Sequence, residues 1–245
     1  MMAQLQVVIP VYNEGSNIHR VLDALAANVR TPFQVLICYD FDEEDTLAAL
    51  EAYPAENVAI RKVRNPGRGP HAAIIAGYSA SSAPVVAVLP ADDDFNAGRL
   101  DDMVNRVLAG NDVVCASRLM KGGTMKGYPL LKATLVRMAA STLHSVARLP
   151  TRDPTNGFRA FPRRVLDKIV VESDQGFTYS LELLVKAHRL GWRIVDIPAQ
   201  WIERSGGAGK SRFRILAWLL PYLRWYFYAY ATTYLRRGPQ TVPRR

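Results

Sequence analysis

Short runs of apolar, β-branched residues alternate with amphipathic stretches along the first half of the chain. The apolar runs lie at 5–9, 35–38, 57–63, 85–89 and 112–116, and stretches of helical periodicity lie between them at 17–29, 45–52, 69–79 and 99–108. The apolar runs are nearly continuous, which is typical of strands that are covered on both faces. This order predicts an α/β fold, in which a mostly parallel sheet is connected by crossover helices.

The pattern changes after residue 117. A basic loop at 121–127 precedes a helical stretch at 130–148, and the turn segment DPTNGFR at 153–159 leads to helical stretches at 163–170 and 179–190 and to a strand at 193–197. We find no internal repeat and no low-complexity linker in the sequence. The sequence therefore predicts one domain over residues 1–210 and a separate C-terminal segment at 211–245.

The positive charge of the chain is concentrated at its C-terminal end. The 245 residues carry a formal net charge of +9. The last 46 residues contain nine Lys or Arg and one acidic residue, which gives a net charge of +8. The first 199 residues contain 22 Lys or Arg and 21 Asp or Glu, which gives a net charge of +1. A protein that binds nucleic acid is expected to be basic over a broader surface. The distribution indicates an anionic partner at one end and gives no support to nucleic-acid binding.

The C-terminal segment is rich in aromatic residues. Nine of the chain's 23 Phe, Trp and Tyr residues lie between Phe213 and Tyr234, and Pro221 and Arg224 interrupt an apolar span that would otherwise reach the about 20 residues of a membrane helix. Flanking arginines and dense aromatic residues favour amphipathic helices that lie in the bilayer interface. The alternative is a helix docked on the domain's own surface. We expect the interfacial arrangement, with five arginines facing lipid headgroups: Arg212, Arg214, Arg224, Arg236 and Arg237.

The cysteines, the first ten residues and the histidines indicate the cellular compartment of the protein and the kind of metal site to expect. The two cysteines, Cys38 and Cys115, lie inside apolar runs, which predicts buried thiols in a reducing compartment. The first ten residues lack the basic start and long apolar stretch of a signal peptide, so we expect a protein on the cytoplasmic side of the membrane. The four histidines have no metal-ligand spacing, which argues against a zinc enzyme.

The first expected strand runs into VVIPVYNE, residues 7–14. In open α/β sheets, ligands bind where the strands end at their carboxyl edge. The glycine pattern of a dinucleotide clamp is missing from this segment, and we expect Pro10, Tyr12 and Glu14 to contact the nucleotide part of a ligand. The alternative is an ordinary strand-to-helix turn with Asn13 as the helix cap.

The second expected strand ends at Asp40, in the acidic turn YDFDEEDT at 39–46. A carboxylate at this place can accept hydrogen bonds from a nucleobase edge or a ribose. The acids that follow fit a simpler explanation, because acids near a helix N-terminus are stabilised by the helix dipole. We therefore single out Asp40 for ligand binding.

The fourth expected strand ends in PADDD, residues 90–94. Three adjacent carboxylates repel one another unless a cation neutralises them. Oxygen ligands suit Mg²⁺ or Mn²⁺, and alternate residues such as Asp92 and Asp94 can point the same way and share one ion. The alternative is a solvated acidic loop that caps the next helix. The position at the end of a strand favours the metal site.

A glycine-rich segment, GGAGKS at 206–211, has part of the P-loop pattern. A P-loop requires its first glycine at the position of Arg204, and too little chain follows for the rest of such a domain. We reject the P-loop and keep Arg204 and Lys210 as cations that clamp phosphate groups.

Five segments in this order resemble glycosyltransferase family 2, and within it the dolichol-phosphate mannose synthase-like branch with the Rossmann-like GT-A fold. VVIPVYNE resembles the opening motif of the family, and RNPGRGPHAAIIAGYSAS resembles its RNxGxGxAxxxGxxxA segment. ASR resembles the GSR motif, and DPTNGFRAF resembles the DxxSGFR motif. IPAQWIERSGGAGKS resembles the stretch that ends in RxxGxSK. Two positions depart from the family, since Tyr39 replaces the first Asp of VDDGS and Pro90 the first Asp of DADLQ. The metal site is therefore expected two residues further on, at Asp92 and Asp94.

The resemblance implies an inverting transfer of a sugar from a GDP- or UDP-sugar to a polyprenyl phosphate. It implies that Arg118, Lys132 and Arg137 hold the acceptor phosphate, and that Asp153 and Asn156 orient sugar hydroxyls. A phosphate monoester is already anionic near neutral pH, so it needs positioning more than a general base. If the acceptor were a glycan or lipid hydroxyl, Asp153 would be the expected base. The predicted catalytic residues are Asp92, Asp94, Asp153 and Arg118.

Other classes of function remain as alternatives. One is a non-enzymatic homologue that binds an anionic partner. A nucleic-acid-binding protein is disfavoured because the carboxylate cluster would repel the phosphates of a nucleic acid. A soluble nucleotidyltransferase is disfavoured because VYNEGSN lacks the lysine expected in the phosphate-binding loop of that class. A second copy of the chain or a membrane protein is an additional candidate partner.

Overall fold

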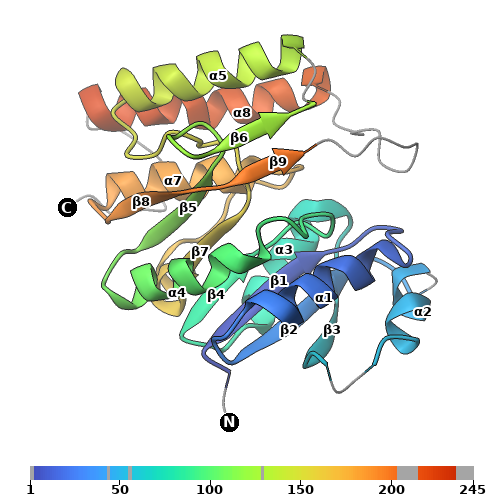
Figure 1. Cartoon of the computed structure of the whole chain (residues 1–245). Coiled ribbons are helices and arrows are strands. Elements are labelled where there is room, and N and C mark those ends of the chain that lie inside the picture. The colour runs from blue at the N-terminus through green and yellow to red at the C-terminus, as the bar shows by residue number, and fades with distance from the viewer. Residues whose placement is uncertain (1–2, 43–44, 55–56, 128–129, 203–214, 236–245) are drawn as a thin grey trace. The chain divides into compact units, whose positions relative to one another are not determined.

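The computed structural model describes residues 3–42, 45–54, 57–127, 130–202 and 215–235, without the side chains of 131–132 and 215–219. The chain divides into two compact units. Unit 1 comprises Met1–Val114 and Gly157–Lys168, and unit 2 comprises Cys115–Asn156 and Ile169–Arg245. Figure 1 shows the order of the elements in both units.

The sheet of unit 1 is parallel except for one strand. Its strands are β1 (Leu5–Pro10), β2 (Phe33–Tyr39), β3 (Ile60–Arg64), β4 (Val85–Val88) and β7 (Arg159–Pro162). β1 pairs in parallel with β2 and β4, with Val7 opposite Val35 on one side and Ala87 on the other. β2 pairs in parallel with β3, and β7 returns antiparallel to β4.

Two further strands complete the sheet. β5 (Val113–Ser117) passes from unit 1 into unit 2, and β8 (Ile194–Pro198) belongs to unit 2. The strand order is β3-β2-β1-β4-β7-β5-β8. The predicted α/β architecture with a mostly parallel sheet is confirmed.

Helices connect the strands of unit 1. They are α1 (Asn17–Asn28), α2 (Asp45–Glu51), α3 (Gly69–Ala80), the short 3₁₀-helix η1 (Ala97–Arg99), α4 (Leu100–Leu108) and α6 (Arg163–Lys168). Figure 1 shows α1 in front of the sheet and α3 behind it. A Cβ atom at Gly77 would lie 2.4 Å from Val8 Cγ1 and 2.8 Å from Cys38 Sγ, so α3 packs on β1 and β2 at a distance that only glycine allows.

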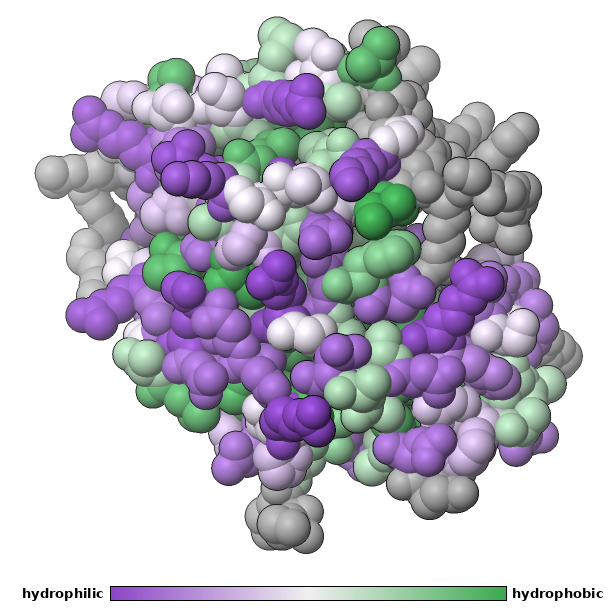
Figure 2. Space-filling view, viewed as in Figure 1, coloured by the Kyte–Doolittle hydropathy of each residue, from purple (hydrophilic) through white to green (hydrophobic). Residues whose placement is uncertain are grey.

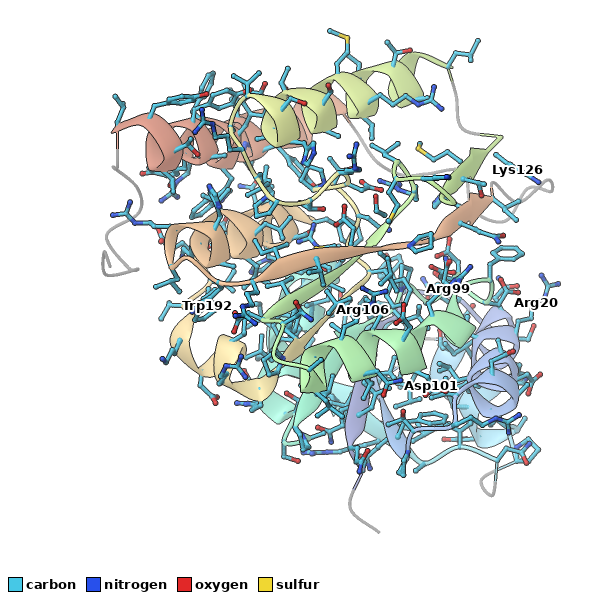
Figure 3. The ribbon with its side chains drawn as sticks, turned by 60° about the vertical axis from the view of Figure 1, so that its left-hand side comes forward. Arg20, Arg99, Asp101, Arg106, Lys126 and Trp192 are labelled. Carbon is cyan, nitrogen blue, oxygen red and sulfur yellow. The ribbon has the colours of Figure 1, made fainter. Side chains whose placement is uncertain are left out.

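Buried residues of unit 1 fulfil two expectations from the sequence. The helical stretch expected at 17–29 forms α1 and buries one apolar face, made of Ile18, Val21, Leu22 and Leu25. Cys38 is a free, buried thiol, and so is Cys115 of unit 2. Burial raises the pKa of the Cys38 thiol to about 12, because the thiolate would lose its hydration. Asp101 on α4, labelled in Figure 3, accepts hydrogen bonds from the backbone nitrogens of Arg30 and Thr31 and so holds the end of α1 against α4.

Unit 2 contains a two-stranded sheet and three longer helices. Its elements besides β8 are β6 (Thr124–Lys126), α5 (Leu130–Ser145), α7 (Thr178–Arg189), β9 (Gln200–Ile202), α8 (Ile215–Tyr230) and the π-helix η2 (Ala231–Leu235). β6 and β9 pair in parallel. The short strands β6, β7 and β9 were not predicted, because their sequences TMK, RAFP and QWI lack the continuous apolar run that marks a strand such as β4 (VVAV).

Helix α8 docks on α7. Trp225 is 1% exposed and lies against Lys186, whose Nζ is 5.2 Å from the centre of the indole ring. The hydroxyl groups of Tyr226 and Thr142 are 2.7 Å apart and connect α8 to α5, and Figure 1 shows these two helices side by side. The alternative that the C-terminal segment docks on the protein's own surface therefore holds for α8. No helix among the described residues is long and apolar enough to span a membrane.

A buried charge cluster joins α7 and α8. Lys186 Nζ forms ion pairs with Glu182 (2.6 Å) and Glu172 (2.8 Å), and the other oxygen of Glu172 pairs with Arg224 of α8 (2.8 Å). Glu182 and Lys186 lie four residues apart, one turn along α7. Arg224, which we expected to face lipid headgroups, is bound to Glu172 and lies over the ring of Trp225.

Candidate active site

Unit 1 brings the predicted nucleotide and metal residues to one edge of its sheet. β1, β2 and β4 are parallel, so Tyr12, Asp40 and Asp92 all follow the carboxyl ends of their strands. The backbone nitrogen of Val11 donates to the carbonyl of Cys38 (2.9 Å), which continues the pairing beyond β1. This edge is where ligands bind in open α/β sheets.

The loop after β1 is held by the first residues of α2. The backbone nitrogen of Glu14 donates to Thr46 Oγ1 (3.0 Å), and that of Gly15 donates to Asp45 Oδ1 (2.9 Å). Asn13 has a positive φ of 52°, a conformation that asparagine tolerates better than most residues. The alternative of Asn13 as helix cap is wrong, because the N-cap residue of α1 is Ser16 and its side chain makes no capping bond.

Asp40 holds the loop that follows β3. Its two carboxylate oxygens accept hydrogen bonds from Asn65 Nδ2 and from the backbone nitrogen of Gly69, each at 2.7 Å. Asp40, Arg64 and Asn65 line a cavity of about 410 Å³ at the ends of β2 and β3. A carboxylate has about four acceptor positions, so these two bonds leave Asp40 able to accept others from a ligand. Sequence reasoning missed Asn65, although it stands in the RNPGRG segment.

An aromatic pair lies at the same edge. The rings of Tyr12 and Phe41 are 5.9 Å apart and meet edge to face at 81°. Tyr12 is half exposed, so the pair offers an apolar surface at the ends of β1 and β2. Sequence reasoning missed Phe41, because the contact depends on how two loops pack and not on spacing along the chain.

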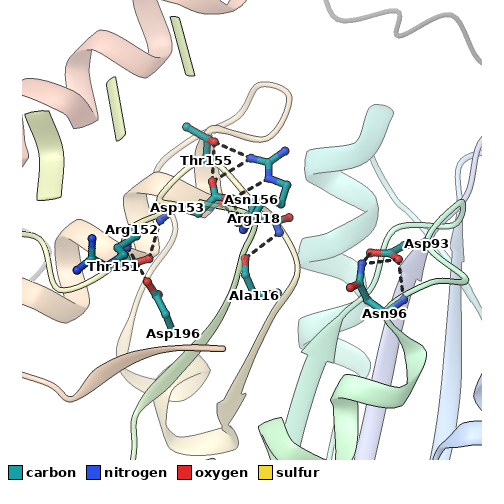
Figure 4. A network of polar contacts seen from close by, with 11 residues as sticks. Asp93, Asn96, Ala116, Arg118, Thr151, Arg152, Asp153, Thr155, Asn156 and Asp196 are labelled. Atoms are coloured by element: carbon teal, nitrogen blue, oxygen red, sulfur yellow. Dashed lines mark hydrogen bonds and ion pairs between the residues drawn. The ribbon is translucent and has the colours of Figure 1, made fainter. Parts of the chain in front are cut away.

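The three aspartates after β4 have different environments. Asp93 accepts hydrogen bonds from the backbone nitrogen (3.1 Å) and the side-chain Nδ2 (2.8 Å) of Asn96, as Figure 4 shows. Burial raises the pKa of Asp93 to about 6, although the bonds from Asn96 work in the opposite direction. Asp93 therefore binds Asn96, the N-cap residue of the 3₁₀-helix η1, and is not a solvated carboxylate, while Asp92 is exposed and Asp94 half-buried.

The donor set of Asp92 and Asp94 fits a hard divalent cation. Two carboxylates from alternate residues supply oxygen ligands, and Mg²⁺ is usually held by one or two carboxylates together with substrate phosphates. Within the described residues, no group of three or more His, Cys, Asp or Glu side chains is placed to hold a metal ion.

In unit 2 the predicted residues Arg118 and Asp153 bind each other. Arg118 Nε donates to Asp153 Oδ2 (2.7 Å), Arg118 Nη2 donates to Oδ1 (2.9 Å), and Nη2 also donates to Thr155 Oγ1 (3.0 Å), as drawn in Figure 4. The side chain of Asp153 is fully buried and that of Arg118 is 8% exposed. Burial alone would raise the pKa of Asp153, but the hydrogen bonds and charge of Arg118 outweigh it and leave the pKa lowered.

Asn156 completes this network. Its side-chain Nδ2 donates to the carbonyl oxygen of Ala116 (2.8 Å), and its own carbonyl accepts from Ser180 Oγ (3.3 Å). Asp153 and Asn156 therefore bind their own chain here, and they hold the segment 151–156 against the end of β5. Their predicted contacts with sugar hydroxyls stay a prediction.

The remaining basic residues predicted to bind phosphate or lipid do not belong to the network of Arg118 and Asp153. Arg137 lies on α5 with an exposed side chain, and Lys132 lies in α5 with a side chain outside the described set. The phosphate clamp predicted from Arg204 and Lys210 also falls outside the described residues, as do most of the tail arginines: Arg212, Arg214, Arg236 and Arg237.

Comparison with known proteins identifies the family. Residues 6–170 match the family described as glycosyl transferase family 2. The chain belongs to glycosyltransferase family 2. It is therefore a glycosyltransferase, and the resemblance found in the sequence is confirmed.

Curated proteins similar to this chain include three glycosyltransferases from different organisms. An uncharacterised glycosyltransferase of Mycobacterium tuberculosis is 32% identical over 83% of this chain and 88% of its own. The polyprenol monophosphomannose synthase of Mycolicibacterium smegmatis is 25% identical over 86% of this chain and 85% of its own. The dolichol-phosphate mannosyltransferase of Pyrococcus furiosus is 24% identical over 91% of this chain and 64% of its own.

Solved structures agree on the fold of this glycosyltransferase. Glucosyl-3-phosphoglycerate synthase of Mycobacterium tuberculosis, crystallised with UDP, matches with a TM-score of 0.67 at 17% identity, over 94% of this chain and 80% of that one. At this identity the likeness shows the fold alone, and that fold is the GT-A arrangement expected from the sequence.

Proposed function

We propose that this glycosyltransferase transfers a sugar from a GDP- or UDP-sugar to the phosphate of a polyprenyl phosphate, with inversion at the anomeric carbon. Two family members of this kind, a polyprenol monophosphomannose synthase and a dolichol-phosphate mannosyltransferase, are 25% and 24% identical to the chain. The observation that carries the acceptor choice is the buried pair of Arg118 and Asp153.

The buried pair favours an acceptor that needs no general base. If a hydroxyl group were the acceptor, Asp153 would have to take its proton, but both oxygens of this carboxylate accept bonds from Arg118 and none of the side chain is exposed. A phosphate monoester reacts through an oxygen that is already anionic. It therefore needs only a binding site that orients it toward the sugar.

The donor nucleotide is assigned to the edge of unit 1. Asp40 has acceptor positions left for a base or ribose, and the pair of Tyr12 and Phe41 offers an apolar surface for a ring. Pro10 and Glu14 lie in the same loop as Tyr12 and are kept as nucleotide contacts.

Asp92 and Asp94 are assigned to a divalent cation, Mg²⁺ or Mn²⁺. When bound, such an ion offsets the negative charge that develops on the leaving nucleoside diphosphate. A glucosyl-3-phosphoglycerate synthase with the same fold was crystallised with Mn²⁺ and UDP, which supports a divalent ion for this fold. Arg204 and Lys210 are proposed to bind the donor phosphates.

The bond changes of the proposed reaction balance without a proton transfer. An acceptor phosphate oxygen forms a bond to the anomeric carbon, and the bond from that carbon to the donor diphosphate breaks. The electron pair of the broken bond leaves with the nucleoside diphosphate. Attack opposite to the leaving group gives inversion.

The acceptor also suggests where the enzyme works, since polyprenyl phosphates are lipids. We place the protein at the cytoplasmic face of a membrane through the C-terminal segment. α8 supports this, because Leu220 and Phe227 are exposed although the same helix buries Trp225. The +8 charge of the last 46 residues would attract anionic lipid headgroups.

The test is product analysis with labelled sugar nucleotides. The full chain is incubated with GDP- and UDP-sugars, Mn²⁺ or Mg²⁺, and one of three acceptors: a polyprenyl phosphate, 3-phosphoglycerate or a long-chain alcohol. We expect metal-dependent transfer to the polyprenyl phosphate and loss of transfer in Asp92→Asn with Asp94→Asn. Transfer to the alcohol, or only to 3-phosphoglycerate, contradicts the proposal.

A further inference from the structure

A cavity of about 260 Å³ lies beside helix α5 within unit 2. Its walls come from one face of α5 and from the two loops that follow β5 and precede Asp153. The polar residues that line it are Arg137, Ser141, His144, Ser145 and Arg152, and Leu119 contributes an apolar side chain. The volume is smaller than the about 300–1,000 Å³ of sites for drug-sized ligands, so the cavity suits a small group.

The cavity is positively charged. Arg137 and Arg152 both line it, and within the described residues neither guanidinium group forms an ion pair with a carboxylate. None of the described residues that line the cavity is acidic, and the whole stretch from 113 to 152 contains seven Lys or Arg and no Asp or Glu. Two guanidinium groups that line one cavity attract an anion, and their planar forks match the oxygens of a phosphate.

Neutral donors lie next to these charges. The hydroxyl groups of Ser141 and Ser145 can donate hydrogen bonds to phosphate oxygens. The Nδ1 atom of His144 is 3.1 Å from the carbonyl oxygen of Leu149. Because a carbonyl only accepts, Nδ1 carries a proton, and Nε2 is the other ring nitrogen that a ligand can use.

The buried pair of Arg118 and Asp153 positions the walls of this cavity. Leu119 directly follows Arg118, and Arg152 directly precedes Asp153, so the pair fixes both loops at once. The backbone nitrogen of Arg152 is also held, because it donates to Asp196 Oδ2 (2.7 Å). The residues that form the GSR-like and DxxSGFR-like motifs thus build the cavity, although neither charged side chain of the pair lines it.

An apolar surface adjoins the cavity on the same helix. Met138 is 61% exposed and lies two turns of α5 before the lining residue Ser145, on the same side of the helix, and Leu135, one turn before Met138, is 46% exposed. Figure 2 shows hydrophobic side chains among hydrophilic ones along the upper edge of the view, where α5 lies in Figure 1. A phosphate in the cavity can therefore carry an apolar chain that lies along α5.

We infer that the α5 cavity is a binding site for a phosphate monoester, held by Arg137, Arg152 and His144. Two sources share this chemistry, a lipid that ends in a phosphate and free inorganic phosphate. The inference deepens the proposed function, on which it rests for the identity of a lipid acceptor. Of the residues predicted from the sequence it keeps Arg137, and it adds Arg152 and His144. Arg118 acts as a positioning residue, and Lys132 has its side chain outside the described set.

The test measures the binding of phosphate ligands in the absence of a sugar nucleotide, so that no sugar transfer takes place. Isothermal titration calorimetry of the full chain at constant ionic strength uses inorganic phosphate and geranyl phosphate, a short prenyl phosphate. We expect Arg137→Gln and Arg152→Gln each to raise the Kd at least about tenfold, the effect of losing one hydrogen bond to a charged group. The matched control is Arg20→Gln on α1, which removes the same charge from unit 1 and should leave the Kd unchanged.

Three results would overturn the site. They are an unchanged Kd in both variants, an equal rise in Arg20→Gln, and no binding of either ligand by the wild type. Thermal unfolding in chloride checks that each variant is folded. If one is not, Ser141→Asp replaces it, since a carboxylate at the exposed rim should repel phosphate and weaken binding to a similar extent.

Further arms separate the two sources of phosphate. If geranyl phosphate binds more tightly than inorganic phosphate, and Leu135→Ser with Met138→Ser weakens its binding, the ligand is a lipid phosphate. If the two ligands bind equally well, the ligand is free phosphate. Binding only to vesicles that contain phosphatidylglycerol, with neither soluble ligand bound, overturns the cavity site.

The outcomes also separate this inference from the proposed function. Phosphate binding without any sugar transfer defeats the proposed function alone. Transfer to a polyprenyl phosphate with an unchanged acceptor KM in Arg137→Gln and Arg152→Gln defeats the inference alone.

Discussion

Arg118 surrounds one carboxylate oxygen of Asp153 with two donors. Its backbone nitrogen (3.0 Å) and its Nε (2.7 Å) both donate to Oδ2, while Nη2 donates to Oδ1. The pair is almost completely buried, so each charge depends on the other for compensation. This relationship gives two family motifs a structural role, because it connects the end of β5 to the segment 151–156.

Breaking the buried pair should destabilise the protein strongly. Asp153→Asn leaves the Arg118 guanidinium buried without its counter-charge, and we expect a loss of about 3–5 kcal/mol in the free energy of unfolding. The control is Asp102→Asn, which breaks the exposed pair with Arg106 on α4 (Arg106 is labelled in Figure 3) and should cost about 1 kcal/mol or less. Urea unfolding measures both, and equal losses would contradict the assignment.

The same pair predicts a dependence on acid pH. The pKa of Asp153 is lowered in the folded state, because Arg118 outweighs the effect of burial. Its contribution is fully present above the unfolded-state pKa, about 3.9, and is lost as the pH falls through the lower folded-state value. The stability difference between wild type and Asp153→Asn should therefore shrink below about pH 4. A difference that stays constant down to pH values near 3 would argue against this.

His188 predicts a second pH effect, in a different window. It lies on α7, 3.3 Å from Thr233 Oγ1 of η2, and burial lowers its pKa. A histidine with a lowered folded-state pKa stays neutral when the unfolded chain takes up a proton, so stability should decrease as the pH falls below about 6.5. His188→Gln removes the titration, and its unfolding free energy should change less between pH 7.5 and pH 5.5. Parallel curves for both proteins would show that His188 is not responsible.

Trp225 should anchor helix α8. Its side chain is 1% exposed, and Lys186 Nζ and Arg224 Cζ lie 5.2 Å and 5.1 Å from the centre of its ring. Trp225→Ala removes a large buried side chain, and we expect a loss of about 3–5 kcal/mol. Phe227→Ala on the same helix is the control, because Phe227 is 62% exposed and its loss should change stability by less than about 0.5 kcal/mol. Thermal or urea unfolding measures both.

The exposed side chains of α8 and η2 should govern association with membranes. Replacing Leu220, Phe227 and Leu235 by serine removes apolar groups that are exposed in the structure. We expect this triple variant to float less with vesicles that contain phosphatidylglycerol, with little change in unfolding free energy. Leu108→Ser with Val170→Ser serves as the control, because both residues are exposed but lie outside these helices. Unchanged flotation of the triple variant would contradict the interfacial role.

Much of the fold could be predicted from the sequence because it depends on local patterns. The strands and helices up to residue 117 follow from apolar runs and helical periodicity, and the structure places them within a few residues of the predicted bounds. The positions of Tyr12, Asp40 and Asp92 at strand ends followed from the same pattern. Strand β7 did not, because GFRAF lacks a continuous apolar run and its antiparallel pairing with β4 joins segments far apart in the sequence.

The partners of the charged residues were decided only by the tertiary structure. The sequence by itself determined the α/β class, the family motifs, the two buried thiols and the concentration of charge at one end. It did not determine that Arg118 binds Asp153, 35 residues away, that Asp93 turns inward to Asn96, or that Arg224 binds Glu172, 52 residues away. Such contacts depend on the directions in which packed elements present their side chains, and spacing along the chain does not encode these directions.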